Sequence, residues 1–239
     1  MLRKRWEIVP LDISERKSTK DLLALDDKTL NEIWETSRNK DQEGDGFGHR
    51  GWYRTLYKDF VSDKKILDVG CGFGFDGITF LEFGADVTFA DIVQSNLDVV
   101  RRIGDIRKLS KRASFLYFGD VQSLKKLDND FDVIFAVGSL HNAPFHVMKS
   151  EVDELTNHLK VSGRWLQLAY PKTRWIRDGS PPFDRWGQRT DGEGTPWEEW
   201  YDVPKLLDLL APAKFDLVFY TEFHNHDFNW FDLIFRGKP

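Results

Sequence analysis

Closely spaced glycines between a strand-like run and a helix-like run are the feature of this chain best suited to bind a ligand. The stretch reads Lys65-Ile-Leu-Asp68-Val-Gly70-Cys-Gly72-Phe-Gly74-Phe-Asp-Gly77. Backbone amides at such a turn approach a ligand closely, because glycine carries no side chain. Residues 72–77 also fit the GxGxxG dinucleotide pattern, and Asp91 follows Gly72 by nineteen residues, where it could hold ribose hydroxyls. The turn therefore predicts a nucleotide cofactor.

Asp68 bears on the class of that cofactor. A carboxylate two residues before the first glycine repels a pyrophosphate, whereas it favours a cationic ligand. A nicotinamide-dependent oxidoreductase is thus an alternative that the GxGxxG pattern and Asp91 support and that Asp68 opposes. The structural alternative for Asp68 is that it only caps the following turn.

Apolar and amphipathic runs alternate on either side of the glycine turn. The strand candidates are Lys65–Val69, Ala85–Ala90, Ser114–Phe118, Phe131–Val137 and Arg164–Ala169, and helix-like segments around Phe75–Phe83, Gln94–Ile103 and Phe145–Leu159 lie between most of them. This order predicts a parallel sheet covered on both faces. Two aromatic-rich runs, Phe215–Glu222 and Asn229–Phe235, are joined by a segment too short for a crossover helix, so they predict an antiparallel hairpin.

The acidic residue and glycines of the turn make the chain resemble class I S-adenosylmethionine-dependent methyltransferases. Their first motif is a strand, an acidic residue and then x-Gly-x-Gly-x-Gly, as in the segment from Asp68 to Gly74. Later family landmarks follow in order across residues 50–170: Asp91, Asp120-Val121, and Phe131-Asp-Val-Ile-Phe-Ala-Val-Gly-Ser-Leu-His141-Asn142. The resemblance implies an α/β fold with a doubly wound, mostly parallel seven-stranded, Rossmann-like sheet and a C-terminal antiparallel hairpin.

The resemblance also implies S-adenosylmethionine as the cofactor and assigns residues to its parts. The methionine part is expected beside Asp68 and along Gly70, Gly72 and Gly74, the ribose on Asp91, and the adenine between Asp120 and Val121, with Val137 at the end of the fourth strand completing the set.

Histidines near the ends of strands are the candidates for moving a proton. Methyl transfer from a sulfonium is an in-line displacement, so the protein aligns the reactants, removes water and, for a hydroxyl acceptor, takes up a proton. Histidine suits this task near neutral pH. His141, directly after the fourth strand, is the first candidate for the base, with pocket shaping as the alternative. His226 and His224, in the hairpin turn, are second candidates, with a turn-forming role as the alternative.

The cluster of His224, His226 and Asp227 also has residue types that bind metals. The spacing alone is common, and no further ligand can be located from the sequence. We therefore expect no metal. Cys71 is the only cysteine, which excludes an internal disulfide and a multi-cysteine metal site.

Two segments are rich in turn-forming residues. Asp41–Gly51 holds four glycines and predicts a flexible connector, or else a loop that closes over a ligand. Pro171–Val203 is rich in glycine, proline and tryptophan, so it predicts a lid over the substrate, with a self-packed excursion as the alternative. The expected substrate contacts are Tyr53, Asn142, Trp186, Trp197 and Asp227, although core packing also explains the aromatic stripe that holds Tyr53.

Length and composition fit a single domain of 239 residues. We divide it into an N-terminal helical cap with the glycine-rich loop (1–62), a cofactor-binding core (63–170), a Trp-rich lid insertion (171–203) and a terminal helix with the hairpin (204–239). The net charge of −5 opposes a nucleic-acid partner. The lack of a long apolar run opposes a membrane span, and one cysteine suits a reducing cytoplasm.

Together these features predict a methyltransferase that acts on a small molecule. A hydroxyl oxygen of a carbohydrate or secondary metabolite is the preferred acceptor, because loops and aromatic residues are expected to close the pocket. Nitrogen acceptors stay open. Besides the oxidoreductase, the alternative is a non-catalytic domain that keeps the cofactor fold and binds another protein.

Overall fold

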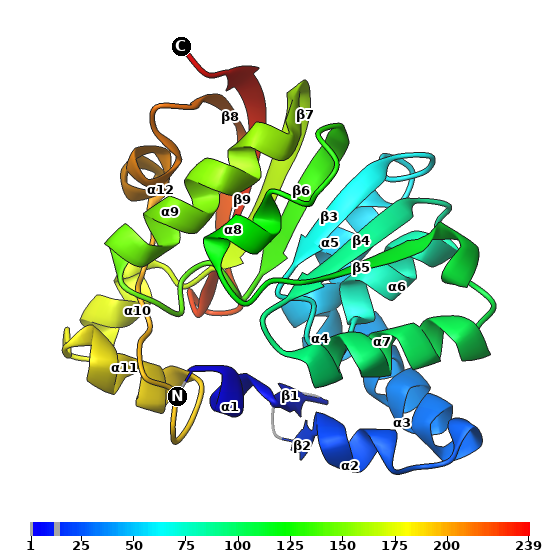
Figure 1. Ribbon diagram of the computed structural model, residues 1–239. Coiled ribbons are helices and arrows are strands. Elements are labelled where there is room, and N and C mark those ends of the chain that lie inside the picture. Colours follow the sequence, from blue (N-terminus) through cyan, green and yellow to red (C-terminus); the bar gives the residue numbers. More distant parts are fainter. Residues whose placement is uncertain (1, 12–14) are drawn as a thin grey trace. The chain divides into compact units, whose positions relative to one another are not determined.

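The computed structural model describes residues 2–11 and 15–239 (Figure 1). The chain divides into two compact units, Arg3–Phe118 and Gly119–Pro239 with Leu2. In the described part of the chain, none of the helices combines the length and the apolar character needed to cross a bilayer.

The first unit begins with a small helical and extended layer. It consists of α1 (Leu2–Trp6), the antiparallel pair β1 (Ile8–Pro10) and β2 (Arg16–Ser18), α2 (Thr19–Leu23) and α3 (Asp27–Asn39). Asp26 starts α3, because its carboxylate accepts a hydrogen bond from the Thr29 amide at 2.9 Å. Leu30 and Trp34 lie four residues apart on the buried face of α3.

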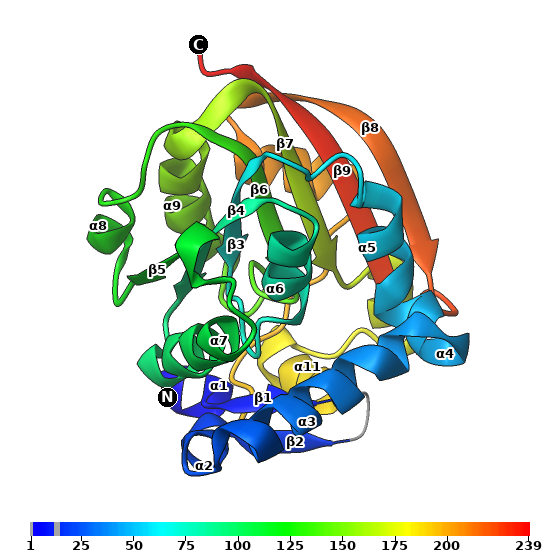
Figure 2. The same ribbon diagram turned by 90° about the vertical axis from the view of Figure 1, so that its right-hand side faces the viewer.

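The segment predicted as a flexible glycine loop is instead mostly helical. It contains a 3₁₀ turn (Lys40–Gln42), α4 (Gly44–Gly46) and a π-helical turn (Phe47–Gly51) that runs directly into α5 (Trp52–Tyr57), as the blue ribbon in Figure 2 shows. Gly46 and Gly51 allow these turns to touch: a Cβ would lie 2.0 Å from the Lys40 carbonyl oxygen at the first and 1.9 Å from that of Asp41 at the second. These two glycines serve close packing rather than flexibility.

Three parallel strands form the centre of the first unit. β4 (Asp86–Asp91) lies between β3 (Lys65–Val69) and β5 (Ala113–Tyr117). The connections contain α6 (Phe75–Glu82) and α7 (Gln94–Ile106), with a 3₁₀ turn at Ser110–Arg112. Four of the five residues of β3 are buried, as expected for a parallel strand covered on both faces.

The second unit contains the remaining strands. β6 (Phe131–Val137) pairs in parallel with β7 (Leu159–Ala169), and β9 (Phe228–Gly237) pairs antiparallel with both β7 and β8 (Lys214–Phe223). The helices are α8 (Val121–Leu124), α9 (Phe145–Leu155), α10 (Lys172–Arg177), α11 (Phe183–Thr190) and α12 (Val203–Leu210), with a 3₁₀ turn at Thr156–His158; α12 packs beside α9 (Figure 1). Strands β3 to β9 confirm the predicted α/β, mostly parallel seven-stranded fold with its C-terminal hairpin.

The Trp-rich insertion packs on itself within the second unit. Its helices α10 and α11 are short and separated by a proline-containing segment. The Trp175 ring lies 6.0 Å from Trp200 and 5.9 Å from Phe183, and the Lys205 ammonium lies 4.1 Å above the Trp200 ring. The aromatic rings of the insertion therefore pack against one another and against Lys205.

Candidate functional site

The predicted cofactor turn adopts the backbone conformation that its glycines permit. Gly70, Gly72 and Gly74 all have φ between +53° and +73°, the left-handed region that favours glycine. Gly77 is needed for a different reason, because a Cβ there would lie 2.3 Å from the Phe89 ring and 2.6 Å from Asp68 Oδ2. The turn thus brings the start of α6 directly against β3 and β4.

Asp68 is buried beneath this turn. Only 4% of its surface is exposed, and its carboxylate accepts a hydrogen bond from the Gly77 amide. Burial, with the charges of Asp76 and Asp91, holds the pKa of Asp68 well above its usual range. Asp68 thus bonds to the turn that it precedes, and its role beside the cofactor stays a prediction.

Asp91 ends β4 and faces the same turn. Its Oδ1 accepts from the Val93 amide at 2.8 Å, and its Oδ2 accepts from the Gly72 amide at 3.1 Å and from Asn96 Nδ2 at 3.3 Å. Burial raises its pKa, and the bonds from Val93 and Gly72 act in the opposite direction. A carboxylate held beside the glycine turn, at the carboxyl end of a parallel strand, has the position and chemistry that a ribose diol requires.

Tyr53, expected to contact substrate, lies with two partners in the same unit. Its side chain is fully buried, and its hydroxyl donates to Asp76 Oδ1 at 3.2 Å. Arg54 pairs with Asp76 at 2.5 Å and with Asp41 at 2.9 Å. Sequence reasoning missed Arg54 and Asp76; the available signals were the one basic residue of α5 and a carboxylate two residues after Gly74.

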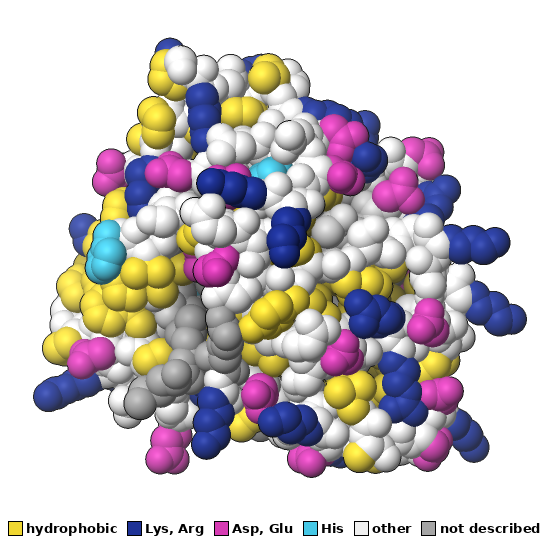
Figure 3. Space-filling model, in the orientation of Figure 1, with side chains coloured by type: hydrophobic (Ala, Val, Ile, Leu, Met, Phe, Trp, Pro, Cys, Tyr) yellow, Lys and Arg dark blue, Asp and Glu magenta, His cyan; other side chains and the backbone are white. Residues whose placement is uncertain are grey.

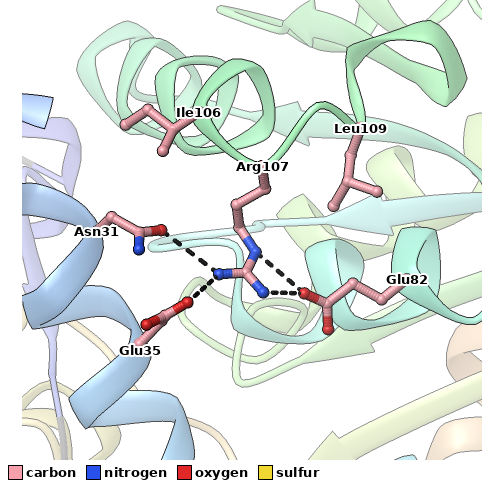
Figure 4. Close-up of a pocket in the computed structure, with 6 residues that line it drawn as sticks. All are labelled: Asn31, Glu35, Glu82, Ile106, Arg107 and Leu109. Carbon is pink, nitrogen blue, oxygen red and sulfur yellow. Dashed lines mark hydrogen bonds and ion pairs between the residues drawn. The ribbon is translucent and has the colours of Figure 1, made fainter. Parts of the chain in front are cut away.

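The hollow in Figure 4 lies away from all of these residues. It measures about 270 Å³ and is lined by residues of α3, α6 and α7 and by Leu109. Arg107 points into it and bonds to Glu82, Glu35 and Asn31. Because these acceptors neutralise the guanidinium, we assign Arg107 to bridging the three helices rather than to binding a ligand.

His141 forms the centre of a buried polar cluster in the second unit. Its exposed fraction is 1%, and its Nδ1 lies 2.9 Å from Oε1 of the fully buried Glu198. Asn142 Nδ2 donates to Glu198 Oε2 at 2.7 Å, so Asn142, a predicted substrate contact, is engaged inside the protein. The His141 ring also hydrogen-bonds the backbone of Gly138 and lies 4.9 Å from the Tyr170 ring.

Burial shifts the pKa of each partner in the direction that favours its neutral form. It lowers the pKa of His141 to about 4. It raises the pKa of Glu198 well above its usual range, with a further contribution from Asp191, which also accepts from the Tyr170 hydroxyl at 3.0 Å. At neutral pH the imidazole is therefore in the form that can accept a proton.

Glu198 belongs to the Trp-rich insertion, and sequence reasoning missed it. The predicted lid tryptophans lie in the same insertion. Trp186 is fully buried and donates to Asp178 Oδ2 at 2.9 Å, while Trp197 is half-buried and donates to Glu199 Oε2 at 3.2 Å. The Trp186 ring therefore serves the packing of the insertion in this conformation.

The hairpin residues lie in a tight turn between β8 and β9. His224, Asn225 and His226 all have left-handed φ. His226 is 68% exposed and its Nδ1 lies 2.9 Å from Glu222 Oε2, whereas His224 Nδ1 lies 3.5 Å from Asp227 Oδ2. Arg177 pairs with Asp227 and also donates to the Asn225 carbonyl at 2.8 Å, so these contacts join α10 to the hairpin.

The adenine candidates are at the start of the second unit. The Asp120 carboxylate accepts from the Ser123 amide at 2.9 Å and so caps α8, with Val121 next to it. Val137 ends β6 and is half-buried.

Within residues 2–11 and 15–239, no three His, Cys, Asp or Glu side chains are grouped to hold a metal ion. On the face shown in Figure 3, basic side chains are interspersed with acidic ones.

Comparisons with known proteins agree with this geometry. Residues 66–163 match a family model described as a methyltransferase domain. A ubiquinone/menaquinone biosynthesis C-methyltransferase of Zymomonas mobilis is 29% identical over 133 residues, which cover 52% of each chain. A histidine protein methyltransferase 1 homolog of Dictyostelium discoideum is 34% identical over 110 residues, 44% of this chain and 34% of that protein. The matched part of the chain thus spans about half of the length of the first of these relatives and about a third of the length of the second.

A solved structure extends the similarity over most of the chain. The magnesium protoporphyrin IX methyltransferase of Synechocystis, with bound S-adenosylhomocysteine, superposes with a TM-score of 0.61 at 15% identity, covering 87% of this chain and 99% of that one. At such identity the likeness shows the fold. Together with the matched family model, it confirms the resemblance to class I S-adenosylmethionine-dependent methyltransferases, and residues 66–163 form a methyltransferase domain.

Proposed function

We propose that this chain transfers the methyl group of S-adenosylmethionine to a hydroxyl oxygen of a small molecule, a carbohydrate or secondary metabolite, with His141 as the general base. The cofactor supplies an electrophilic methyl on a sulfonium. In the first unit, the Gly72 amide and the Asp91 carboxylate fit its ribose side. The similarity to several methyltransferases supports the reaction type. The names of these relatives give different acceptors, so the acceptor of this chain is inferred from its own residues.

The observation that carries the choice of oxygen is the His141–Glu198 pair. A hydroxyl nucleophile must lose a proton during the displacement, and a neutral imidazole can take it. The imidazolium so formed has the Glu198 carboxyl 2.9 Å from Nδ1, which stabilises it and fixes the ring orientation. The Gly138 contact raises the pKa of His141, so it is a ring N–H that donates to the backbone of this exposed residue. For the ring to take the acceptor's proton at that nitrogen, the neutral imidazole carries its own proton on Nδ1, toward Glu198, and the acceptor hydroxyl replaces the Gly138 backbone as the partner.

The test measures transfer of labelled methyl from S-adenosylmethionine to a panel of hydroxylated and amino acceptors. We expect His141→Gln to lower turnover by about 100-fold or more while leaving S-adenosylhomocysteine affinity within about threefold. His158→Gln is the matched control, since His158 is equally buried in the same unit but bonds to the Asp128 carbonyl. Unchanged turnover in His141→Gln contradicts the base. Saturable binding of NADH with none of S-adenosylhomocysteine contradicts the reaction class.

A further inference from the structure

Arg174 is a partly buried cation of the Trp-rich insertion that acidic groups neutralise only weakly. It lies in α10, and 16% of its side chain is exposed. Among the residues that the structure describes, its one hydrogen bond runs from Nη1 to the Asp227 carbonyl oxygen at 3.0 Å, and its one ion pair joins Nε to Asp227 Oδ1 at 3.9 Å. That carboxylate pairs more closely with Arg177. The guanidinium therefore keeps charge and N–H groups that an anion can use.

The same guanidinium lies close to the proposed base. The centre of the Tyr170 ring is 4.9 Å from the centre of the His141 ring and 4.4 Å from Cζ of Arg174. After burial, the charge of Arg174 is a further cause that lowers the pKa of His141, and it opposes the burial that raises the pKa of Glu198. A small molecule with its hydroxyl at His141 can therefore reach Arg174 with a second group.

The acidic groups near Arg174 are engaged or favoured in their neutral form. Asp191 accepts from the Tyr170 hydroxyl at 3.0 Å, and burial raises the pKa of Glu198 well above its usual range. Residues 172–190, which contain α10 and α11, also carry five basic side chains against two acidic ones, in a chain whose net charge is −5. This excess of positive charge favours an anionic ligand.

Aromatic rings border the guanidinium. The centre of the Phe228 ring is 5.6 Å from Cζ of Arg174 and 5.6 Å from the centre of the Tyr170 ring. Such rings offer an apolar surface next to the charge, so the site suits an organic molecule that carries an anion better than it suits an inorganic ion.

We propose that Arg174 binds an anionic oxygen group of the methyl acceptor, a carboxylate or a phosphate ester, while the acceptor hydroxyl lies at His141. This inference rests on the proposed function and narrows its acceptor to hydroxylated acids. The bound anion offsets the charge of the guanidinium, so the imidazole accepts a proton more readily once such an acceptor is in place. An uncharged acceptor leaves that charge uncompensated at a partly desolvated position.

The test measures methyl transfer to hydroxylated acceptors in three matched forms: a carboxylic acid, a phosphate ester and the uncharged primary amide. One set is para-hydroxybenzoate, para-hydroxyphenyl phosphate and para-hydroxybenzamide, and a carbohydrate set is glucuronate, a glucose phosphate and glucuronamide. We expect kcat/KM for an anionic form to exceed that for its amide by about 10-fold or more. The ratio of acid to phosphate ester shows which anion the site takes.

Substitution of Arg174 should remove this preference. In Arg174→Gln, kcat/KM for the preferred anionic form should fall by about 10- to 100-fold, mainly through KM, and kcat/KM for the amide should stay within about threefold. Arg174→Lys keeps the charge but loses the planar pair of N–H groups, so it should retain part of the preference. Arg189→Gln is the matched control, because this arginine of the same insertion is 60% exposed and bonds to the Asp178 carbonyl; it should leave the preference unchanged.

Equal kcat/KM for anionic and uncharged forms in the wild type, or an equal loss of both in Arg174→Gln, overturns the anion site and leaves the proposed function standing. Methyl transfer to none of the hydroxylated forms overturns both. If Arg174→Gln does not fold, a crystal structure of the wild type with S-adenosylhomocysteine and the preferred acceptor decides the point. An anionic oxygen within hydrogen-bond distance of the Arg174 guanidinium supports the site, and an anion bound elsewhere overturns it.

Discussion

The protonation of Glu198 can be tested by two substitutions that differ in what they leave behind. Alanine removes the oxygen that faces His141 Nδ1 at 2.9 Å and the oxygen that accepts from Asn142 at 2.7 Å. The Asn142 amide then lacks its acceptor, at about 1–3 kcal/mol, and the lost side chain leaves a cavity that costs about 1–2 kcal/mol, so Glu198→Ala should lower the free energy of unfolding by about 2–5 kcal/mol.

Glutamine has the shape of a protonated glutamate and can keep both contacts. If Glu198 is neutral, as its raised pKa implies, Glu198→Gln should cost no more than about 1 kcal/mol. If the carboxyl were ionised and paired with an imidazolium, glutamine would abolish a buried ion pair and cost about 3–5 kcal/mol, close to alanine.

Urea unfolding at pH 7 measures both variants, with the slope of the transition checked for two-state behaviour. Glu199 is the control: its Oε1 accepts from the Lys205 ammonium at 2.7 Å, and glutamine cannot replace that ion pair. We therefore expect Glu199→Gln to cost more than Glu198→Gln. A Glu198→Gln variant as unstable as Glu198→Ala would refute the neutral pair.

The remaining predictions concern pH, packing and cofactor affinity. In Glu198→Gln, His141 stays buried, and burial lowers its pKa from 6.5 to about 4. The free energy of unfolding should therefore be highest above pH 6.5 and fall by about 3 kcal/mol as the pH drops toward 4. Urea unfolding across this pH range measures the change, and a flat profile contradicts it. Gly77→Ala should destabilise by about 1–3 kcal/mol in thermal or urea unfolding, because its Cβ would overlap Phe89 and Asp68, and a neutral effect would show that the turn yields. Asp91→Asn should weaken S-adenosylhomocysteine by about 10- to 100-fold in calorimetry, since an amide cannot accept two ribose hydroxyls and keep the Gly72 amide; unaltered affinity would remove Asp91 as the ribose ligand.

The elements that the sequence predicted well are those whose signal is local. The glycine turn after β3 and the terminal hairpin follow from residue types within a dozen positions, and both are in the structure. Asp91 could be placed beside the turn because parallel strands end at one edge of a sheet.

The parts that the sequence did not predict depend on distant contacts or on an ambiguous residue type. Glu198 reaches Asn142 across 56 positions, and nothing in the local pattern of the insertion links it to the fourth strand. The glycines of 41–51 suggested flexibility because composition cannot distinguish a glycine in a free loop from one that allows helical turns to touch. The distances to Lys40 and Asp41 settle this for Gly46 and Gly51.

Glu198 lies in the Trp-rich insertion, so the insertion takes part in the proposed reaction. The partner of the expected base is supplied by the insertion, and its neighbour Glu199 is held by Lys205 and by the Trp197 indole. The Glu199 amide also donates to the His141 carbonyl at 3.0 Å, so the backbone of the insertion is fixed directly to the residue it orients. Substitutions that loosen this part of the insertion should therefore lower turnover as well as acceptor affinity. In the proposed reaction, the insertion thus contributes to the proton-accepting machinery.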